Sequence, residues 1–455
     1  MKKFPASFIN KLDQILPLAA DRSLFVESLL HESPISIRYH PVKSQKSLFE
    51  NEEKIPWCSH GFYLEKRPSF TLDPFFHAGC YYVQESSSMI LDYLCKVLVS
   101  GNKPLKILDL CAAPGGKSTL LASVLNKNDL LISNEVNRSR AEILSENVQK
   151  WGYSNHWVTC NTPKQFGENL PDFFDIILVD APCSGEGMFR KLDHSIDEWS
   201  EDNVKKCHIR QTEILQDVWP ALKNEGLLVY STCTYNTIEN EETIRSFSST
   251  HSCSSIAVDF PSEWKIQGYE NQKQIVYRCL PHLVKGEGFT FSILQKEETS
   301  PHKQKIKSKA VKFTTSGGTA DYLSKDQSFL QFQQDDLLFA IPEVHVESYK
   351  LSSPLIYFLK KGIHIGSQKT KGILWNPMLS LSLDLNLAYF EKIQLEKEQC
   401  LDLLRLQNPL LKALELINEG WVCFMFQDKP LGWLKNMGSR YNNYYPNHWK
   451  IRLSK

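Results

Sequence analysis

The chain has 455 residues, 42% of them apolar, which is more than one hydrophobic core usually holds, so two or three domains are expected. Lysine plus arginine and aspartate plus glutamate both number 52, and the resulting zero net charge excludes a polycation that coats nucleic acid by bulk attraction. Any nucleic-acid contact must then come from a local patch of the surface.

Residues 1–100 are expected to form a small N-terminal module. The polar residues Asn10, Lys11 and Asp13 interrupt the start of the chain before an apolar signal-peptide core develops, and no later run is apolar for long enough to span a membrane. We expect a cytoplasmic, monomeric protein with no membrane segment. Within this module, apolar residues occur at helical spacing at Phe8, Ile9, Leu12, Ile15 and Leu16.

Residues 101–297 alternate short β-rich runs with amphipathic stretches, a pattern typical of a parallel sheet with helices on both faces. The pattern predicts a doubly wound, Rossmann-like α/β core. The predicted strands are 105–110, 130–135, 156–160, 175–180 and 227–233. Crossover helices are predicted where apolar residues follow helical spacing, from Ala141 to Trp151 and from Val204 to Val218.

Residues 298–319 are predicted to be a basic linker, because lysines recur there without a hydrophobic period and are followed by Ser316-Gly317-Gly318. The lysines are Lys303, Lys305, Lys307, Lys309 and Lys312. Residues 320–455 contain short strand-like runs at 337–342, 355–359 and 422–426, so we expect a β-rich C-terminal region.

None of the twelve cysteines belongs to a Cys-x2-Cys pair, which is the spacing that strong zinc sites normally show. No metal is therefore expected. Because the chain lacks a secretion signal, these cysteines are better explained as reduced cytoplasmic thiols than as a disulfide framework.

A loop of small residues follows the first predicted strand and leads directly into a helix, the position at which doubly wound folds bind a ligand. It reads Cys111-Ala112-Ala113-Pro114-Gly115-Gly116-Lys117-Ser118. A phosphate-binding P-loop would need glycine at position 111 and a backbone N–H at position 114, where this chain has Cys111 and Pro114. An adenosine-type cofactor fits better, because Glu135 ends the second strand about twenty residues later and can accept hydrogen bonds from ribose hydroxyls. The alternative for Glu135 is a solvated loop charge.

Two more strand ends carry cysteines, in Asp180-Ala181-Pro182-Cys183-Ser184-Gly185 and in Ser231-Thr232-Cys233-Thr234. Both ends are expected at the same edge of the sheet as the cofactor loop. A single cysteine is more often a buried packing residue. Two of them, each closing a core strand and one preceded by Asp180, are hard to explain by packing alone.

These groups suit the methylation of carbon 5 of cytosine. That carbon is a weak nucleophile until a thiolate adds to carbon 6, so the reaction needs a cysteine. A carboxyl group such as Asp180 can quench the charge that develops at ring nitrogen 3, and a second group must help to remove the carbon-5 proton. Spacing alone does not decide whether Cys183 or Cys233 attacks.

The motifs resemble those of the Sun-type RNA cytosine-5 methyltransferases, and most closely those of the bacterial members that act on 16S ribosomal RNA. The resemblance depends on the three motifs above, the last extended by Tyr235-Asn236 and Glu239-Asn240-Glu241. It also depends on Ser69-Phe70-Thr71-Leu72-Asp73-Pro74, on Tyr82-Val83-Gln84-Glu85-Ser86-Ser87-Ser88 and on Gly286-Glu287-Gly288-Phe289.

The resemblance implies that Cys233 is the nucleophile and that Cys183 assists release of the methylated product. It also implies that S-adenosyl-L-methionine is held by residues 111–117 and Glu135, with Asp180 serving both the cofactor pocket and the target base. Family members commonly carry an aspartate near the adenine, shortly after the third strand, where this chain has Thr162.

The expected partner is RNA, either ribosomal RNA or the small ribosomal subunit; transfer RNA and a non-catalytic role in ribosome assembly are the alternatives. The last 27 residues contain basic and aromatic side chains but no acidic one: Lys429, Lys435, Arg440, Lys450, Arg452 and Lys455, with Trp433, Tyr441, Tyr444, Tyr445 and Trp449. Basic groups can neutralise phosphates and aromatic faces can stack on unpaired bases. Composition alone fits an aromatic β-domain core equally well, and the resemblance favours a PUA-like RNA-binding tail. The target cytosine must be unpaired or flipped out.

Overall fold

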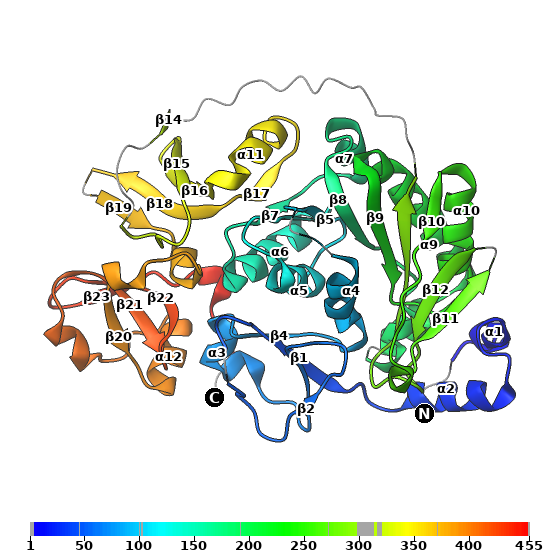
Figure 1. Cartoon of the computed structure of the whole chain (residues 1–455). Coiled ribbons are helices and arrows are strands. Elements are labelled where there is room, and N and C mark those ends of the chain that lie inside the picture. Colours follow the sequence, from blue (N-terminus) through cyan, green and yellow to red (C-terminus); the bar gives the residue numbers. More distant parts are fainter. Residues whose placement is uncertain are drawn as a thin grey trace.

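The computed structural model describes residues 4–44, 46–99, 101, 103–191, 193–271, 273–297, 314–315, 321–370 and 372–453. These residues form four sheets, arranged as an N-terminal module, a large central α/β core and two β-rich units at the C-terminal end (Figure 1). The lysines of the predicted linker, Lys303 to Lys312, lie outside the described residues. No helix among the described residues is both long and apolar enough to cross a bilayer.

The N-terminal module contains four helices and an antiparallel sheet of order β2-β3-β1-β4. Its elements are α1 (Ala6–Lys11), α2 (Ala19–Leu30), β1 (Ile35–Tyr39), β2 (Glu53–Lys54), β3 (Gly61–Leu64), α3 (Pro74–His77), β4 (Tyr81–Val83) and α4 (Leu91–Leu98). Of the five apolar residues predicted at helical spacing, Ile9 is exposed and the other four are buried. The buried four pack against Phe189 and Tyr235, next to the loops that carry Cys183 and Cys233.

The core sheet has the order β11-β12-β13-β9-β8-β5-β6-β7-β17, and β10 pairs with β13. Its strands are β5 (Lys106–Asp109), β6 (Leu130–Asn134), β7 (His156–Thr159), β8 (Phe174–Asp180), β9 (Leu222–Thr232), β10 (Cys253–Ser255), β11 (Gln267–Asn271), β12 (Gln274–Cys279), β13 (Phe289–Lys296) and β17 (Phe358–Lys360). The five predicted strands are confirmed as the parallel part, β5 to β9. Strand β9 begins earlier than predicted, at Leu222.

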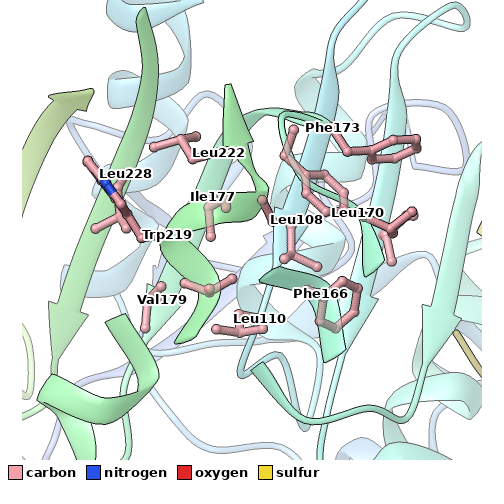
Figure 2. Close-up of a cluster of buried hydrophobic side chains, with 14 of the residues drawn as sticks. Leu108, Leu110, Phe166, Leu170, Phe173, Ile177, Val179, Trp219, Leu222 and Leu228 are labelled. Carbon is pink, nitrogen blue, oxygen red and sulfur yellow. The ribbon is translucent and has the colours of Figure 1, made fainter. Parts of the chain in front are cut away.

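Helices cover both faces of this sheet: α5 (Gly116–Val124), α6 (Arg138–Trp151), α7 (Pro163–Asn169), α8 (Asp193–Glu198), α9 (Glu201–Val218) and α10 (Thr243–Thr250). Alternate residues of one strand are buried in different clusters, because successive side chains of a strand point to opposite faces. Leu108 and Ile177 join Phe166 of α7 in the cluster drawn in Figure 2, whereas Ile107 packs on the other face. Burial on both faces explains the continuous apolar runs in the sequence.

The C-terminal region contains two sheets, β14-β15-β16-β18-β19 and β20-β21-β22-β23. The elements are β14 (Thr314–Thr315), β15 (Phe329–Gln334), β16 (Leu337–Pro342), α11 (Val346–Ser352), β18 (Ile363–Lys369), β19 (Gly372–Trp375), β20 (Glu391–Gln394), α12 (Lys397–Leu404), β21 (Gly420–Phe426), β22 (Lys429–Asn436) and β23 (Tyr441–Asn443). Strand β14 lies within the predicted linker. The predicted strand at 355–359 is observed only from Phe358 onward, and as β17 it pairs with β7 of the core sheet.

A half-buried lysine, Lys43, connects the N-terminal module, the core and the C-terminal region. Lys43 Nζ donates hydrogen bonds to the carbonyl oxygens of Ala78, Lys150 and Leu381, at 3.1, 2.6 and 2.8 Å. The backbone segments around Gly152 and Leu381 approach closely here because Gly152, which ends α6, has no side chain. A Cβ at this position would lie 2.4 Å from Leu381 O.

Replacing Gly152 with alanine is therefore expected to destabilise the protein by about 1–3 kcal/mol, because its φ of +93° is unfavourable for alanine and the new methyl group would press on Leu381. The unfolding free energy in urea measures this loss. Gly372 is a matched control, since its φ is +108° and nothing lies within 4 Å of a Cβ there. An equal loss of unfolding free energy in Gly372→Ala would show that the contact with Leu381 adds nothing to the destabilisation.

Candidate active site

A cavity of about 290 Å³ lies at the carboxyl ends of β5, β8 and β9. Among its lining residues are Tyr82, Gln84, Glu85, Asp109, Cys111, Ala112, Ala113, Pro114, Gly116, Lys117, Asp180, Met188, Lys191, Cys233, Glu287 and Phe289. The loop after the first core strand and two of the later strand ends thus meet in one place, as the sequence predicts for a doubly wound fold.

The loop turns into α5 at Gly115, whose φ is +116° and which favours glycine for that reason. A side chain of the N-terminal module binds the first turn of this helix. The buried Arg38 of β1 donates hydrogen bonds to Gly116 O at 3.3 Å and to Thr119 Oγ1 at 2.7 Å. Burial lowers the pKa of Arg38 to about 10.

Asp109 at the end of β5 is completely buried and has one carboxyl oxygen without a partner. Its Oδ2 accepts a hydrogen bond from Ser118 Oγ at 2.5 Å. Its Oδ1 has no hydrogen-bond partner, and Asp109 is one of the residues that line the cavity. Burial raises the pKa of Asp109 to about 7, with Asp180 adding to the effect. An unsatisfied buried acceptor is costly unless a donor fills the site, so this oxygen fits a cationic or N–H group of a ligand.

An ion pair crosses the floor of the cavity. Lys117 Nζ lies 2.7 Å from Asp180 Oδ2, and Ser231 Oγ donates to Asp180 Oδ1 at 2.9 Å. Burial alone would lower the pKa of Lys117, but the Asp180 carboxylate outweighs it and raises that pKa. The ammonium therefore stays charged beside Cys233, which lines the same cavity.

The two strand-end cysteines are in contact. Cys183 Sγ lies 3.0 Å from Cys233 Sγ, although the residues are 50 positions apart in the sequence. The hydrogen bond with Cys233, burial, and the negative charge that Cys233 can carry raise the pKa of Cys183 well above its usual range. Cys183 is thus the proton-holding member of the pair, and Cys233 is the member that lines the cavity.

Two buried glutamates fix the loops that carry these cysteines. Glu239 Oε2 accepts hydrogen bonds from Ser184 N at 2.9 Å and from Gln211 Nε2 at 2.8 Å. Glu186 Oε2 accepts from the backbone N–H groups of Tyr235 and Asn236, at 2.7 and 3.0 Å. Each loop is therefore held by carboxylates and backbone groups of the other, which restricts the sulfur positions.

Three of the predicted site residues do not line the cavity. Cys183 is not among the lining residues although its sulfur contacts that of Cys233, and Gly115 lies against Leu144 of α6. Glu135 is 3% exposed, and its carboxylate accepts from Asn137 N at 3.0 Å and lies 3.3 Å from the Arg140 guanidinium. The remaining ones, residues 111–114, Gly116, Lys117, Asp180 and Cys233, are brought together there.

Two segments of the resemblance that lie outside the parallel strands, 82–88 and 286–289, also meet at this cavity. Glu85 Oε1 accepts hydrogen bonds from Ser87 N at 2.7 Å and Glu287 N at 2.8 Å, so the segments around residues 85 and 287 form one wall. Thr162, by contrast, caps α7 by accepting a hydrogen bond from Gln165 N. A structural role at a helix start explains the residue found there.

The sequence reasoning missed Asp109 and Glu186, and it named Glu239 only as part of a motif of the resemblance, without a role. Asp109 directly precedes the loop, so an acid at the end of the first strand was the available signal. The contacts by which the two glutamates fix the loops could not be predicted, because the groups that they bind across the site lie 28 to 55 residues away in the sequence.

The aromatic residues of the tail are mostly core residues rather than exposed stacking surfaces. Trp433, Tyr445 and Trp449 are 0%, 5% and 7% exposed and pack inside the C-terminal units. Tyr441 and Tyr444 are half-buried. Arg440, Lys450 and Arg452 are exposed, so this surface offers cations more than aromatic faces, and Lys455 lies outside the described residues.

Comparison with known proteins gives three family models along the chain. Residues 97–295 match the model described as 16S rRNA methyltransferase RsmB/F, residues 4–86 match the N-terminal domain of 16S rRNA methyltransferase RsmF, and residues 391–451 match the methyltransferase RsmF PUA domain. Ribosomal RNA small subunit methyltransferase F of Escherichia coli K12 is 28% identical over 97% of this chain and 96% of its own length. The protein of the same name from Shigella boydii is 29% identical over the same shares.

Two solved structures share the fold. A methyltransferase homologue from Pyrococcus horikoshii superposes with a TM-score of 0.51 at 23% identity, covering 64% of this chain and 99% of that one. NSun6 from Pyrococcus horikoshii, crystallised with SFG, superposes with a TM-score of 0.54 at 17% identity, covering 65% and 99%. The Rossmann-like methyltransferase core with an N-terminal module and a C-terminal PUA domain is thereby confirmed.

Proposed function

Because the chain belongs to the RsmB/F family of S-adenosylmethionine-dependent 16S rRNA methyltransferases, we propose that it methylates carbon 5 of a cytosine in 16S ribosomal RNA through a covalent bond to Cys233. That it is an RNA methyltransferase follows from the family. The position of the methyl group and the covalent step are the proposal.

The observation that carries this proposal is the sulfur pair beside the cavity. Cys233 lines the cavity together with residues of the 111–117 loop, and the Cys183 sulfur lies 3.0 Å from the Cys233 sulfur. Methylation of a nitrogen or oxygen atom needs no thiolate, whereas carbon 5 of cytosine needs one. A binding protein without catalysis needs neither cysteine.

In the proposed reaction, the Cys233 thiolate forms a bond to carbon 6 of the ring. The ring then carries the negative charge at carbon 5 and nitrogen 3, and the Lys117 ammonium, held by Asp180, stabilises that charge. Carbon 5 takes the methyl group, which S-adenosyl-L-methionine supplies when bound. Loss of the carbon-5 proton and cleavage of the bond between sulfur and carbon 6 restore the aromatic ring and the Cys233 thiolate.

Cys183 is the proposed base for that last proton. In the free enzyme the hydrogen bond to Cys233 and its charge are among the causes that keep the Cys183 thiol protonated. Both are lost once the Cys233 sulfur is bound to carbon. The pKa of Cys183 then falls, its proton can leave to solvent, and its thiolate can accept the carbon-5 proton.

The residues present fit the cofactor. The unsatisfied Oδ1 of Asp109 can accept from its ammonium group, and the small residues of the 111–117 loop let the backbone approach it. The Glu135 carboxylate has acceptor capacity beyond its two present partners and is proposed to bind the ribose hydroxyls. We propose that exposed cations of the tail, including Arg440, Lys450 and Arg452, contact RNA phosphates.

Cofactor affinity is expected to depend on pH through Asp109. Its pKa of about 7 means that it is protonated in the free enzyme below that pH, whereas an ammonium ligand favours the ionised form. The dissociation constant of S-adenosylhomocysteine, which carries the same ammonium, should rise up to about tenfold per pH unit as the pH falls below 7, and level off above it. Calorimetric titration from pH 6 to pH 8 measures this, and Asp109→Asn should bind weakly with a flat profile. If the dissociation constant of Asp109→Asn still rose as the pH fell below 7, the proposed role of Asp109 would be wrong.

The function itself is tested with 16S rRNA transcripts and with small subunits that lack their methylcytosines. Each is incubated with the protein and cofactor, digested to nucleosides and analysed by mass spectrometry. The proposal predicts 5-methylcytidine. Methylation at a ring nitrogen or ribose oxygen would contradict the proposed methylation of carbon 5. Methylation of transfer RNA alone would contradict ribosomal RNA as the substrate. Binding of RNA without methylation would support a role as an assembly factor.

A further inference from the structure

A second cleft, of about 310 Å³, lies between the N-terminal module and α6. Its lining residues are Arg67, Phe70, Thr71, Phe76, Gly79, Tyr81, Tyr82, Val83, Asn147, Lys150 and Trp151. Two of them, Tyr82 and Val83, also line the cavity that contains Cys233. The cleft therefore adjoins the candidate active site. It includes residues of two segments of the resemblance, 69–74 and 82–88, and the chemistry above assigns no role to the cleft residues of either segment.

The lining combines cations with aromatic rings. The exposed Arg67 guanidinium lies 5.4 Å from the centre of the Phe70 ring, and Lys150 Nζ lies 6.0 Å from that of Phe76. Phe76 and Tyr82 are half-buried, and both line the cleft. No carboxylate is among the lining residues. This chemistry suits a flat, apolar group attached to a negative charge.

We propose that this cleft binds an unpaired nucleotide next to the target cytosine, with the base against Phe76 and Tyr82 and the phosphate near Arg67 and Lys150. The inference rests on the proposed function, because it assumes that an unpaired RNA strand enters the neighbouring cavity. Once the target base has left its stack, the adjacent nucleotide has lost a stacking partner, and an aromatic surface can replace it.

Two further observations favour this occupant. The aromatic residues of the tail are largely buried, so exposed rings for stacking must come from elsewhere on the chain. Lys150 Nζ also lies 4.3 Å from the centre of the Trp449 ring, so the cleft adjoins the cationic surface of the tail. A strand of RNA that crosses from the tail to Cys233 would pass over this cleft.

The test compares two double variants in filter binding of a 16S rRNA transcript, with S-adenosylhomocysteine present. Arg67→Met/Lys150→Met removes both cleft cations and keeps the aliphatic bulk, and it should weaken binding by at least about tenfold. Lys66→Met/Lys325→Met removes two exposed cations outside the cleft and should bind within about twofold of the unchanged protein. Phe76→Leu should raise the KM for RNA and leave kcat nearly unchanged.

Photocrosslinking supplies a readout that needs no turnover. A transcript with 4-thiouridine in place of a fraction of its uridines is irradiated on the protein, and the crosslinked peptides are sequenced by mass spectrometry. Crosslinks to Phe76 or Tyr82 are expected, and they should be lost in Phe76→Leu/Tyr82→Leu while crosslinks to the tail persist.

The inference is overturned if the cleft variants bind like the control variants, or if crosslinks fall only in the tail and the Cys233 cavity. A loss of cofactor affinity in the cleft variants, with RNA affinity unchanged, would assign the cleft to the cofactor instead. If RNA crosslinks to the cleft but no 5-methylcytidine forms, the proposed function fails while the nucleotide site stands.

Discussion

Replacing Cys233 with alanine is expected to lower methyl transfer to RNA by at least about a thousandfold, because the other cysteine that lines the cavity, Cys111, is a poor nucleophile. Burial and the nearby carboxylates of Asp180 and Asp109 raise the pKa of the Cys111 thiol far above its usual range. The initial rate of transfer from labelled cofactor measures the loss. Cofactor affinity should be nearly unchanged, since the proposed cofactor contacts lie on the 111–117 loop, Asp109 and Glu135.

Cys95→Ala is the matched control for this prediction. Cys95 is a half-buried thiol on α4, outside the cavity, and its replacement should leave the rate within about twofold. Transfer by Cys233→Ala at more than about one tenth of the normal rate would contradict a nucleophilic role.

Replacing Cys183 with alanine is expected to trap the protein on its RNA. The Cys233 thiolate can still add to carbon 6 and the methyl group can still transfer, but the group proposed to accept the carbon-5 proton is gone. The bond between sulfur and carbon then breaks slowly. A species of protein plus RNA should accumulate and survive a denaturing gel, and ribonuclease treatment should collapse it to a slightly heavier protein band.

The double variant Cys183→Ala/Cys233→Ala distinguishes this adduct from nonspecific association, because it should form none. An adduct that forms with Cys233→Ala, and not with Cys183→Ala, would reverse the two roles. Equal product release by Cys183→Ala and the unchanged protein would show that another base removes the proton.

The sequence predicted the core strands well for a physical reason. Strands β8 and β9 are buried on both faces, so they appear as continuous apolar runs, and the polar residues that follow them mark the edge of the sheet. The same rule placed Cys111, Asp180 and Cys233 at one edge, and the structure brings all three to one cavity.

Contacts between distant parts of the chain could not be predicted this way. The position of each cysteine at a strand end marked both as site residues but did not indicate that they touch, and only the structure reveals that the Cys183 sulfur contacts that of Cys233. The composition of the tail left two interpretations open for the same reason. Basic and aromatic composition does not distinguish a stacking surface from a core, and Trp433 belongs to the core.

The most direct test of a covalent bond through Cys233 uses 16S rRNA transcribed with 5-fluorocytidine in place of cytidine. Fluorine at carbon 5 cannot leave as a proton, so the reaction should stop after methyl transfer with the ring still bound to sulfur. Digestion with protease and ribonuclease, followed by mass spectrometry, should find one methylated 5-fluorocytidine nucleotide on the peptide that contains Cys233. The nucleotide on Cys183, or methylated RNA released without any bond to the protein, would contradict the account.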